Sequence, residues 1–303
     1  MTQRLLAPRT WPSWLLLGTL RLLAALPWAL QRRLGASLGH LVFLFPSRFK
    51  QVVLTNLALC LPNYTERARY DVALQHFKDL GISLFESALT WWGNDMVIER
   101  LSDVEGIDYL ERSQASGRGV ILTSYHSTTL SIGARIINHH IKICPLYRPT
   151  KNPVIAYVSG SSFQKRSQQA ILHTDIRQMV QRLKDGQIVW YIADQNFRRK
   201  GAVKIPFFNI PAATNAFAPR LAQMTNSDVY FYTCIRQTND RYKVIIHPRL
   251  HWEGLDDFTA MCQYHQLIEN AVTNAPSQYW WIHKRFKPLV DTDIDYYNNA
   301  KRP

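Results

Sequence analysis

One histidine stands where a parallel α/β sheet places its chemistry. The apolar run Val120–Thr123 is typical of a buried strand, and it leads directly into Ser124, Tyr125 and His126. Ligands of such sheets bind beyond the carboxyl ends of the strands, so His126 is placed to remove a proton as a general base. A lone histidine at a strand end is more often structural than catalytic, so its position alone leaves both interpretations open.

The elements needed to position His126 alternate along the chain. Strand-like apolar runs occur at residues 117–124, 187–193, 229–236 and 242–247. Helical stretches fall at residues 127–139, 175–184 and 258–274. This alternation predicts an α/β fold with a largely parallel sheet flanked by helices. Before it, residues 34–61 predict helices broken at Pro46, and residues 65–93 predict a long helix with Thr65 as its N-cap.

Residues 11–30 are almost wholly apolar, and ~20 helical residues match a ~30 Å hydrocarbon core. Two residues interrupt this pattern. Arg21 near the middle costs ~2.5–3.5 kcal/mol on insertion scales, and Pro27 kinks or ends a helix. The segment is therefore predicted to anchor the chain either by spanning the membrane with Arg21 snorkelling or paired, or by lying in the interface.

Two other interpretations of this segment are less favoured. A cleaved signal peptide lacks support because no small-residue cleavage pattern follows the apolar stretch. A helix buried in a soluble core is disfavoured because the segment is apolar on every face. The heavier basic cluster follows the segment, at Arg32, Arg33, Arg48 and Lys50, which favours a cytoplasmic position for the bulk of the chain.

Composition excludes several classes of protein. The 303 residues carry 36 Lys and Arg against 22 Asp and Glu, a net charge of +14, with 47% apolar and 12% aromatic residues. This apolar and aromatic content excludes an intrinsically disordered chain. The mean hydropathy of −0.20 argues against a multi-span transporter. The four cysteines have no metal-ligand spacing, so neither a disulfide scaffold nor a zinc site is expected. The charge predicts an anionic partner, but no nucleic-acid-binding signature is present.

Six stretches resemble one known family in their order and spacing. They are LTNLALCLP (54–62), TSYHSTTLSIGAR (123–135), YRPTKNP (147–153), IVWYIADQNF (188–197), KIPFFNIPAATN (204–215) and APSQYWWIHKRFK (275–287). Over roughly residues 40–288 the chain is similar to the lipid A late acyltransferases, the lauroyl and myristoyl transferases of bacterial inner membranes. These belong to a wider lysophospholipid acyltransferase-like group.

The resemblance implies a glycerolipid acyltransferase-like α/β domain over residues 34–303, helical in its first part (34–105), behind a membrane anchor helix at 1–33. It implies transfer of a fatty acyl chain from acyl carrier protein to a hydroxyl of an anionic lipid A precursor in lipopolysaccharide biosynthesis. The expected location is the bacterial inner membrane, with the catalytic domain facing the cytoplasm. No cofactor is expected, because acyl transfer from a thioester to a hydroxyl needs neither redox chemistry nor a metal.

The hallmark of the wider group is a histidine followed, after four residues, by Asp or Glu. His126 matches the base, whereas the acidic position falls on Ser131. By analogy with hydrolytic triads, loss of the orienting carboxylate costs ~10⁴ in rate, or about 5 kcal/mol. Three interpretations follow: Ser131 orients the imidazole as a neutral acceptor, Asp194 supplies the charge from the end of another strand, or catalysis is lost and lipid binding kept. The first two together are favoured, because the other motifs stay in register.

Basic residues are expected to bind the phosphates of such an acceptor. Arg135, Arg166 and Arg285 lie in or near the matched motifs and are predicted, with Asp194, to contact substrate. The wider candidate set is Arg148, Lys165, Arg198, Arg199, Lys200, Lys284 and Lys287. Relatives usually have glycine at the positions of Arg198 and Asn209. The loops on the acceptor side are therefore expected to differ from those of the relatives. Rival hypotheses are a catalytically degenerate lipid-binding protein and an acyltransferase for another phospholipid or amphiphile.

Overall fold

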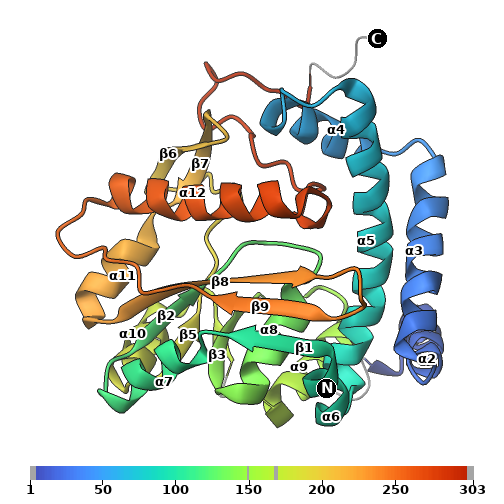
Figure 1. Ribbon diagram of the computed structural model, residues 1–303, viewed down its shortest axis with the longest axis horizontal. Helices are drawn as coiled ribbons and strands as arrows, with labels where there is room; N and C mark the ends of the chain where they lie inside the picture. The colour runs from blue at the N-terminus through green and yellow to red at the C-terminus, as the bar shows by residue number, and fades with distance from the viewer. Residues whose placement is uncertain (1–4, 149, 167–169, 299–303) are drawn as a thin grey trace.

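A seven-stranded, mostly parallel sheet forms the centre of the computed structural model, which describes residues 5–148, 150–166 and 170–298. Its strand order is β1-β9-β8-β2-β5-β3-β4 (Figure 1). The strands are β1 (Ser102–Glu105), β2 (Val120–Thr123), β3 (Ile143–Tyr147), β4 (Ile171–Leu172), β5 (Ile188–Trp190), β8 (Asp228–Arg236) and β9 (Tyr242–Ile246). The β8–β9 pair is antiparallel and the other pairs are parallel, so the predicted mostly parallel sheet flanked by helices is confirmed.

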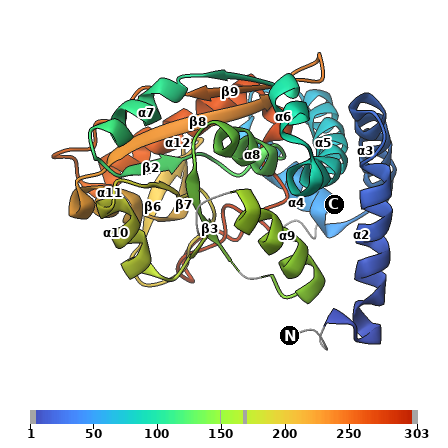
Figure 2. The same cartoon turned by 90° about the horizontal axis from the view of Figure 1, so that it is seen from below.

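Helices cover both faces of this sheet, as the view from below also shows (Figure 2). A hydrophobic core lies on each face of the sheet, and successive residues of β2 point to opposite faces. Ile121 packs in the first core, and Val120 and Leu122 pack in the second. The first core also receives α10 (Ile176–Lys184), α11 (Phe217–Thr225) and α12 (Asp257–Asn274), and the second receives α7 (Ile107–Ala115) and α8 (Leu130–His140). Burial on both sides explains why the strands read as continuous apolar runs.

Other elements complete the described chain. A two-stranded antiparallel hairpin is formed by β6 (Ala202–Phe207) and β7 (Ile210–Asn215). Helix α9 (Pro153–Arg166) precedes β4, and two short 3-10 helices lie at η1 (Pro8–Thr10) and η2 (Pro276–Gln278).

The amino-terminal part is helical. It contains α2 (Trp11–Leu23), α3 (Trp28–Leu44), α4 (Arg48–Cys60), α5 (Glu66–Trp92) and α6 (Asp95–Leu101). The predicted long helix over 65–93 and its N-cap are confirmed, since the Thr65 hydroxyl accepts the Ala68 N–H at 3.2 Å.

The predicted single anchor helix is not continuous. Helix α2 ends at Leu23 and α3 begins directly after Pro27, which has no N–H to continue the ladder. The buried Gln31 amide donates to the carbonyls of Ala24 (3.0 Å) and Leu26 (2.7 Å), which the break leaves free. Within the described residues, no helix has the length and apolar character that crossing a bilayer requires. Arg21 has its guanidinium 5.2 Å from the centre of the Trp92 ring.

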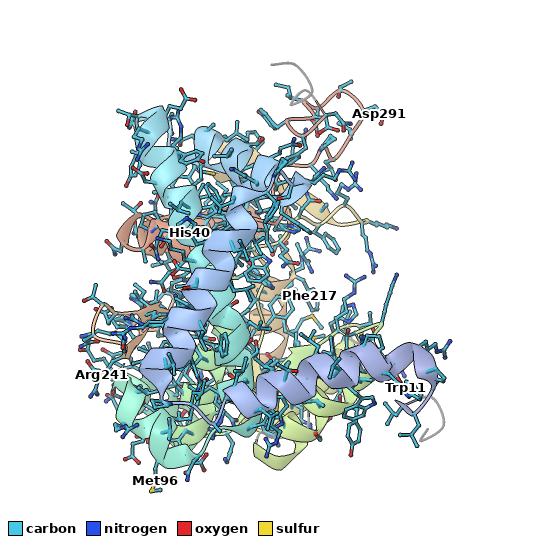
Figure 3. The ribbon with its side chains drawn as sticks, turned by 90° about the vertical axis from the view of Figure 1, so that its right-hand side faces the viewer. Trp11, His40, Met96, Phe217, Arg241 and Asp291 are labelled. Carbon is cyan, nitrogen blue, oxygen red and sulfur yellow. The ribbon has the colours of Figure 1, made fainter. Side chains whose placement is uncertain are left out.

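Helix α3 packs closely along α5. A Cβ atom on Gly39 would lie 1.9 Å from the Phe77 carbonyl oxygen, and one on Gly81 would lie 2.0 Å from the Gly35 carbonyl oxygen. Only glycine permits this approach of the two backbones. The opposite face of α3 is turned to the outside of the molecule (Figure 3).

Candidate active site

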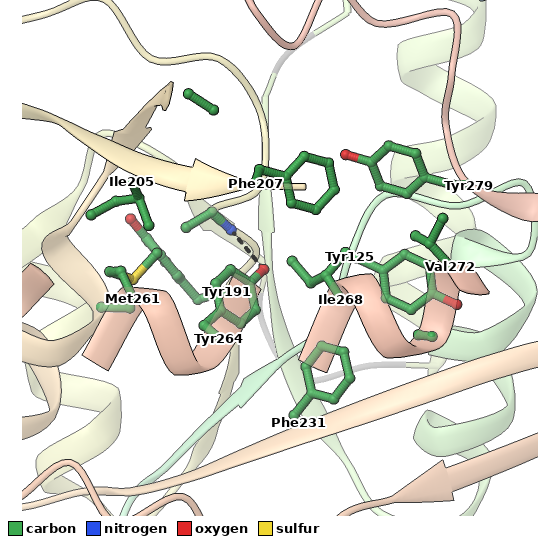
Figure 4. Packing of buried hydrophobic residues seen from close by; sticks show 14 of the residues in the cluster. Tyr125, Tyr191, Ile205, Phe207, Phe231, Met261, Tyr264, Ile268, Val272 and Tyr279 are labelled. Atoms are coloured by element: carbon green, nitrogen blue, oxygen red, sulfur yellow. Dashed lines mark hydrogen bonds between the residues drawn. The ribbon is translucent and has the colours of Figure 1, made fainter. Parts of the chain in front are cut away.

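Hydrogen bonds and ring contacts hold the loop after β2 in place. The Ser124 hydroxyl donates to the Tyr232 carbonyl at 2.9 Å, and the buried Tyr125 ring stacks against Phe231 and Tyr279, with centroids 6.1 and 6.2 Å away. These rings belong to the packed core in Figure 4. The His126 carbonyl then accepts the Trp280 N–H at 3.1 Å. Local packing therefore fixes the backbone that presents the His126 ring.

His126 is paired with Asp194. One carboxylate oxygen of Asp194 accepts the His126 backbone N–H at 2.8 Å, and the other is hydrogen bonded to the ring Nδ1. The pairing follows from topology, because β2 and β5 are parallel neighbours and their carboxyl ends meet at one edge of the sheet. Asp194 is 2% exposed, so this carboxylate interacts with His126 rather than with water.

The electrostatics favour an ionised Asp194. Burial by itself raises the pKa of this carboxyl, but the charge of His126, its two hydrogen bonds and the charge of Arg285 outweigh burial and hold the pKa below its usual value. A carboxylate that accepts the Nδ1 proton leaves the lone pair on Nε2. In the described part of the chain Nε2 has no hydrogen-bond partner, and the side chain is 27% exposed. Nε2 is therefore free to accept a proton.

Arg285 lies buried behind Asp194. Its guanidinium donates to the Ala213 carbonyl at 2.8 Å and to the Thr214 hydroxyl at 2.6 Å, and burial lowers its pKa. At 2% exposure it is too deep to contact a substrate. The structure therefore does not place Arg285 on the predicted substrate surface. Instead, the positive charge of the buried Arg285 side chain stabilises the ionised Asp194 carboxylate.

Three residues near this edge, Asn56, Asn196 and His283, were not singled out from the sequence. The backbone N–H of Asn196 donates to Nε2 of His283 at 3.0 Å, and burial lowers the pKa of His283 to about 4. His283 is in turn held by Asn56 of α4, whose amide donates to the carbonyls of Trp281 (2.7 Å) and His283 (2.8 Å). Each of these residues lies inside one of the six matched motifs, and this was the only sign in the sequence that they belong to the site. The distances between the motifs along the chain could not show that the motifs meet in the fold.

A cleft of about 470 Å³ opens at His126. Its walls combine apolar and aromatic side chains with basic ones, including Arg148, His173, Arg198 and Arg199. Of the described residues that line it, none is acidic. A base beside an apolar and positively charged cleft can deprotonate a hydroxyl of an anionic amphiphile. No group of His, Cys, Asp or Glu within the described residues could hold a metal ion.

The other predicted site residues lie elsewhere. Ser131 is exposed on the first turn of α8, and no hydrogen bond links it to His126 in the described part of the chain. Arg135 is buried, forms an ion pair with Asp95 of α6, and does not line the cleft. Arg166 is the last residue of α9, and its side chain lies outside the described residues.

The chain matches the family model described as bacterial lipid A biosynthesis acyltransferase over residues 1–288. It is 32% identical to the lipid A biosynthesis lauroyltransferase of Escherichia coli, over 93% of this chain and 94% of the relative. It is 30% identical to the palmitoleoyltransferase of the same organism, over 94% of each chain. The solved 1-acyl-sn-glycerophosphate acyltransferase PlsC of Thermotoga maritima is 12% identical with a TM-score of 0.37, covering 75% of this chain and 95% of that one, which is too weak a likeness to support an argument.

These matches run through the six motifs and through the loop that carries His126. The family predicted from those motifs is thereby confirmed, and the chain belongs to the bacterial lipid A biosynthesis acyltransferase family.

Proposed function

We propose that this acyltransferase moves a fatty acyl chain from the thioester of acyl carrier protein to a hydroxyl of a lipid A precursor, with His126 as base and Asp194 as its orienting carboxylate. The observation that carries the proposal is the pairing of Asp194 with the Nδ1 side of His126, which lines a cleft whose described lining residues include no acidic one.

The chemistry follows from that pairing. Nε2 of His126 removes the hydroxyl proton as the oxygen attacks the thioester carbonyl, and Asp194 stabilises the imidazolium that forms. When the C–S bond breaks, His126 returns the proton to the departing thiolate of the carrier. The new C–O ester bond replaces the thioester, and His126 ends neutral, so no cofactor enters the balance.

The acceptor is proposed to be anionic because of its surroundings. Arg148, Arg198 and Arg199 line the cleft, and their guanidinium groups suit bidentate contacts with phosphate. The same positive surface favours approach of an acidic carrier protein.

The site of action is proposed to be the cytoplasmic surface of the bacterial inner membrane. Large apolar side chains of α2, of α3 and of the residue that follows α3 are exposed: Leu15, Leu16, Leu22, Leu34, Leu38, Leu41, Val42, Leu44 and Phe45. The two helices lie on one side of the molecule (Figure 3). Exposed apolar area of this extent is typical of a membrane or protein contact, and two amphipathic helices lying in the interface fit the break at Pro27.

The test is direct. Purified full-length protein is incubated in detergent with labelled acyl carrier protein thioester and a lipid A precursor, and the lipids are analysed by mass spectrometry. Gain of one acyl chain by the precursor supports the proposal. Acylation only of a glycerophospholipid supplied in the same mixture would instead support another acceptor.

The degenerate lipid-binding alternative is favoured by one observation, the serine at position 131. Absence of transfer by both the native chain and the Ser131→Glu variant would support it. In that case precursor binding without turnover would be the remaining activity.

A further inference from the structure

A second groove lies beside the carboxyl-terminal segment 280–287, away from His126. It encloses about 480 Å³ between α4 and the chain near its end. Arg48, Gln51 and Thr55 line it from one face of α4, and Ile282 and Lys284 line it from the carboxyl-terminal segment. The spacing of the α4 residues, three and four apart, places them on one side of that helix.

This groove is separate from the catalytic cleft. Along segment 282–285 alternate residues serve different surroundings: Ile282 and Lys284 line the groove, whereas His283 accepts the Asn196 N–H and Arg285 is buried near Asp194. No described residue lines both cavities. Occupancy of one cavity therefore need not displace a ligand from the other.

The groove is cationic and its donors are unused. Arg48 and Lys284 bring two positive charges, and among the described lining residues there is no carboxylate. The side chains of Arg48, Gln51, Thr55 and Lys284 make no hydrogen bond or ion pair within the described chain; Lys284 Nζ lies 5.3 Å from the centre of the Tyr297 ring. The nearby Asp295 carboxylate is engaged by the Asn298 amide and by the Tyr297 N–H at 3.0 Å.

An apolar surface borders the groove. Phe49 lines it and is 62% exposed, and Leu41, Leu44 and Phe45 at the end of α3 are 53%, 63% and 63% exposed. Helix α3 runs up to α4 at the top of Figure 1, so this apolar end lies next to the cationic groove. Positive charge beside exposed apolar area matches an anionic amphiphile better than a free ion.

We propose that this groove binds the phosphate-monoester headgroup of a membrane lipid, whose acyl chains lie along the exposed end of α3. Two cations with the Gln51 amide and the Thr55 hydroxyl match a dianion that has three acceptor oxygens. The inference rests on the proposed membrane association and is independent of the chemistry at His126.

The experiment measures binding of the purified full chain to phosphatidylcholine vesicles by flotation. One vesicle set contains phosphatidic acid, and the other contains enough phosphatidylglycerol to reach the same surface potential. The groove variant is Arg48→Gln with Lys284→Gln. The matched control is Arg9→Gln with Arg33→Gln, which removes the same charge from exposed positions on η1 and α3 outside the groove.

The native chain should prefer phosphatidic acid vesicles, and the groove variant should lose that preference, binding them about thirtyfold more weakly. The control should bind both vesicle sets more weakly while keeping the preference. Equal behaviour of the two double variants would overturn the proposal, because only diffuse attraction would remain.

Two further arms test free phosphate as the ligand and the role of the catalytic base. Inorganic phosphate at the same concentration as the phosphatidic acid should leave the preference for phosphatidic acid vesicles intact. Loss of the preference under this condition would show that the groove binds free phosphate. His126→Ala should keep the preference, so a failure of the proposed catalysis is distinguishable from a failure of this site.

Discussion

The carboxylate of Asp194 holds both the backbone N–H and the imidazole Nδ1 of His126, although the two residues are 68 positions apart in the chain. Adjacent parallel strands create this contact, and it supplies the negative charge that the residue at position 131 does not. The catalytic proposal therefore rests on sheet topology rather than on a local motif.

Replacing the proposed base should remove most of the activity. His126→Ala is expected to lower the rate of acyl transfer by roughly 10²–10⁴, the usual contribution of general base catalysis. His251→Ala is the control, because this side chain is 77% exposed. Single-turnover transfer of labelled acyl chain is the measurement; undiminished transfer by His126→Ala would show that the base is elsewhere.

The basic cleft residues should act on acceptor binding. Arg148→Gln and Arg199→Gln each remove a cation from the cleft wall, and loss of a charged hydrogen bond should raise KM for the acceptor roughly tenfold or more while kcat changes little. Arg177→Gln, at an exposed position of α10 outside the cleft, is the matched control. A fall in kcat at constant KM would contradict a binding role for these arginines.

Acid should destabilise the fold through buried neutral histidines. Burial lowers the pKa of His76 and of His283 to about 4, and burial together with Arg285 lowers that of His265 to about 3. In the unfolded chain histidine titrates near ~6.5. As pH falls below that value the unfolded state takes up protons that the folded state excludes, so the free energy of unfolding decreases until the folded pKa values are reached.

The test compares urea unfolding at pH 6.5 and pH 5. Each such histidine contributes at most about 2 kcal/mol over this interval, at about 1.4 kcal/mol per pH unit. His76→Gln should reduce the loss of stability by that amount, whereas His251→Gln should leave it unchanged. If the free energy of unfolding falls equally between pH 6.5 and pH 5 in the native and His76→Gln proteins, His76 is not a source of the acid sensitivity.

Asn56 should position the segment beneath the site. Its side chain donates to two carbonyls and accepts the Tyr297 hydroxyl at 2.7 Å, so Asn56→Ala removes three hydrogen bonds worth about 1 kcal/mol each. Thermal unfolding should show that the free energy of unfolding decreases by about 3 kcal/mol. In the transfer assay kcat should fall by a larger factor than KM rises. Asn270→Ala, at an exposed position of α12, is the control, and equal effects of the two variants would contradict the role of Asn56.

The elements that carry a strong apolar period were predictable from the sequence. The strand before His126 and the long helix beginning after Thr65 follow from local pattern and capping alone. The β6–β7 hairpin was not predicted, because its turn uses Phe208 and Asn209 at φ values of 49° and 62°, where glycine is the usual signal. Pro27 indicated the break in the apolar amino terminus, and Gln31 shows how the broken ends are satisfied.

The candidate site could be predicted only in part. Asp194 was one of two proposed partners of His126, and its approach depends on the pairing of β2 with β5, which no local spacing reveals. Ser131 lies five residues after His126, about 140° further around a regular helix, and the structure leaves it exposed. Arg135 meets Asp95 across 40 residues, a contact between α8 and α6 that required the fold.

The most direct measurement is the turnover of Asp194→Asn beside that of Ser131→Ala, with acyl carrier protein thioester and lipid A precursor as substrates. Asparagine keeps the size of the side chain but removes its charge, so kcat should fall by about 10⁴. Ser131→Ala should stay within about twofold of the native rate, because this side chain is exposed and makes no hydrogen bond to His126 in the described structure. A large loss in Ser131→Ala with near-native turnover in Asp194→Asn would contradict the account.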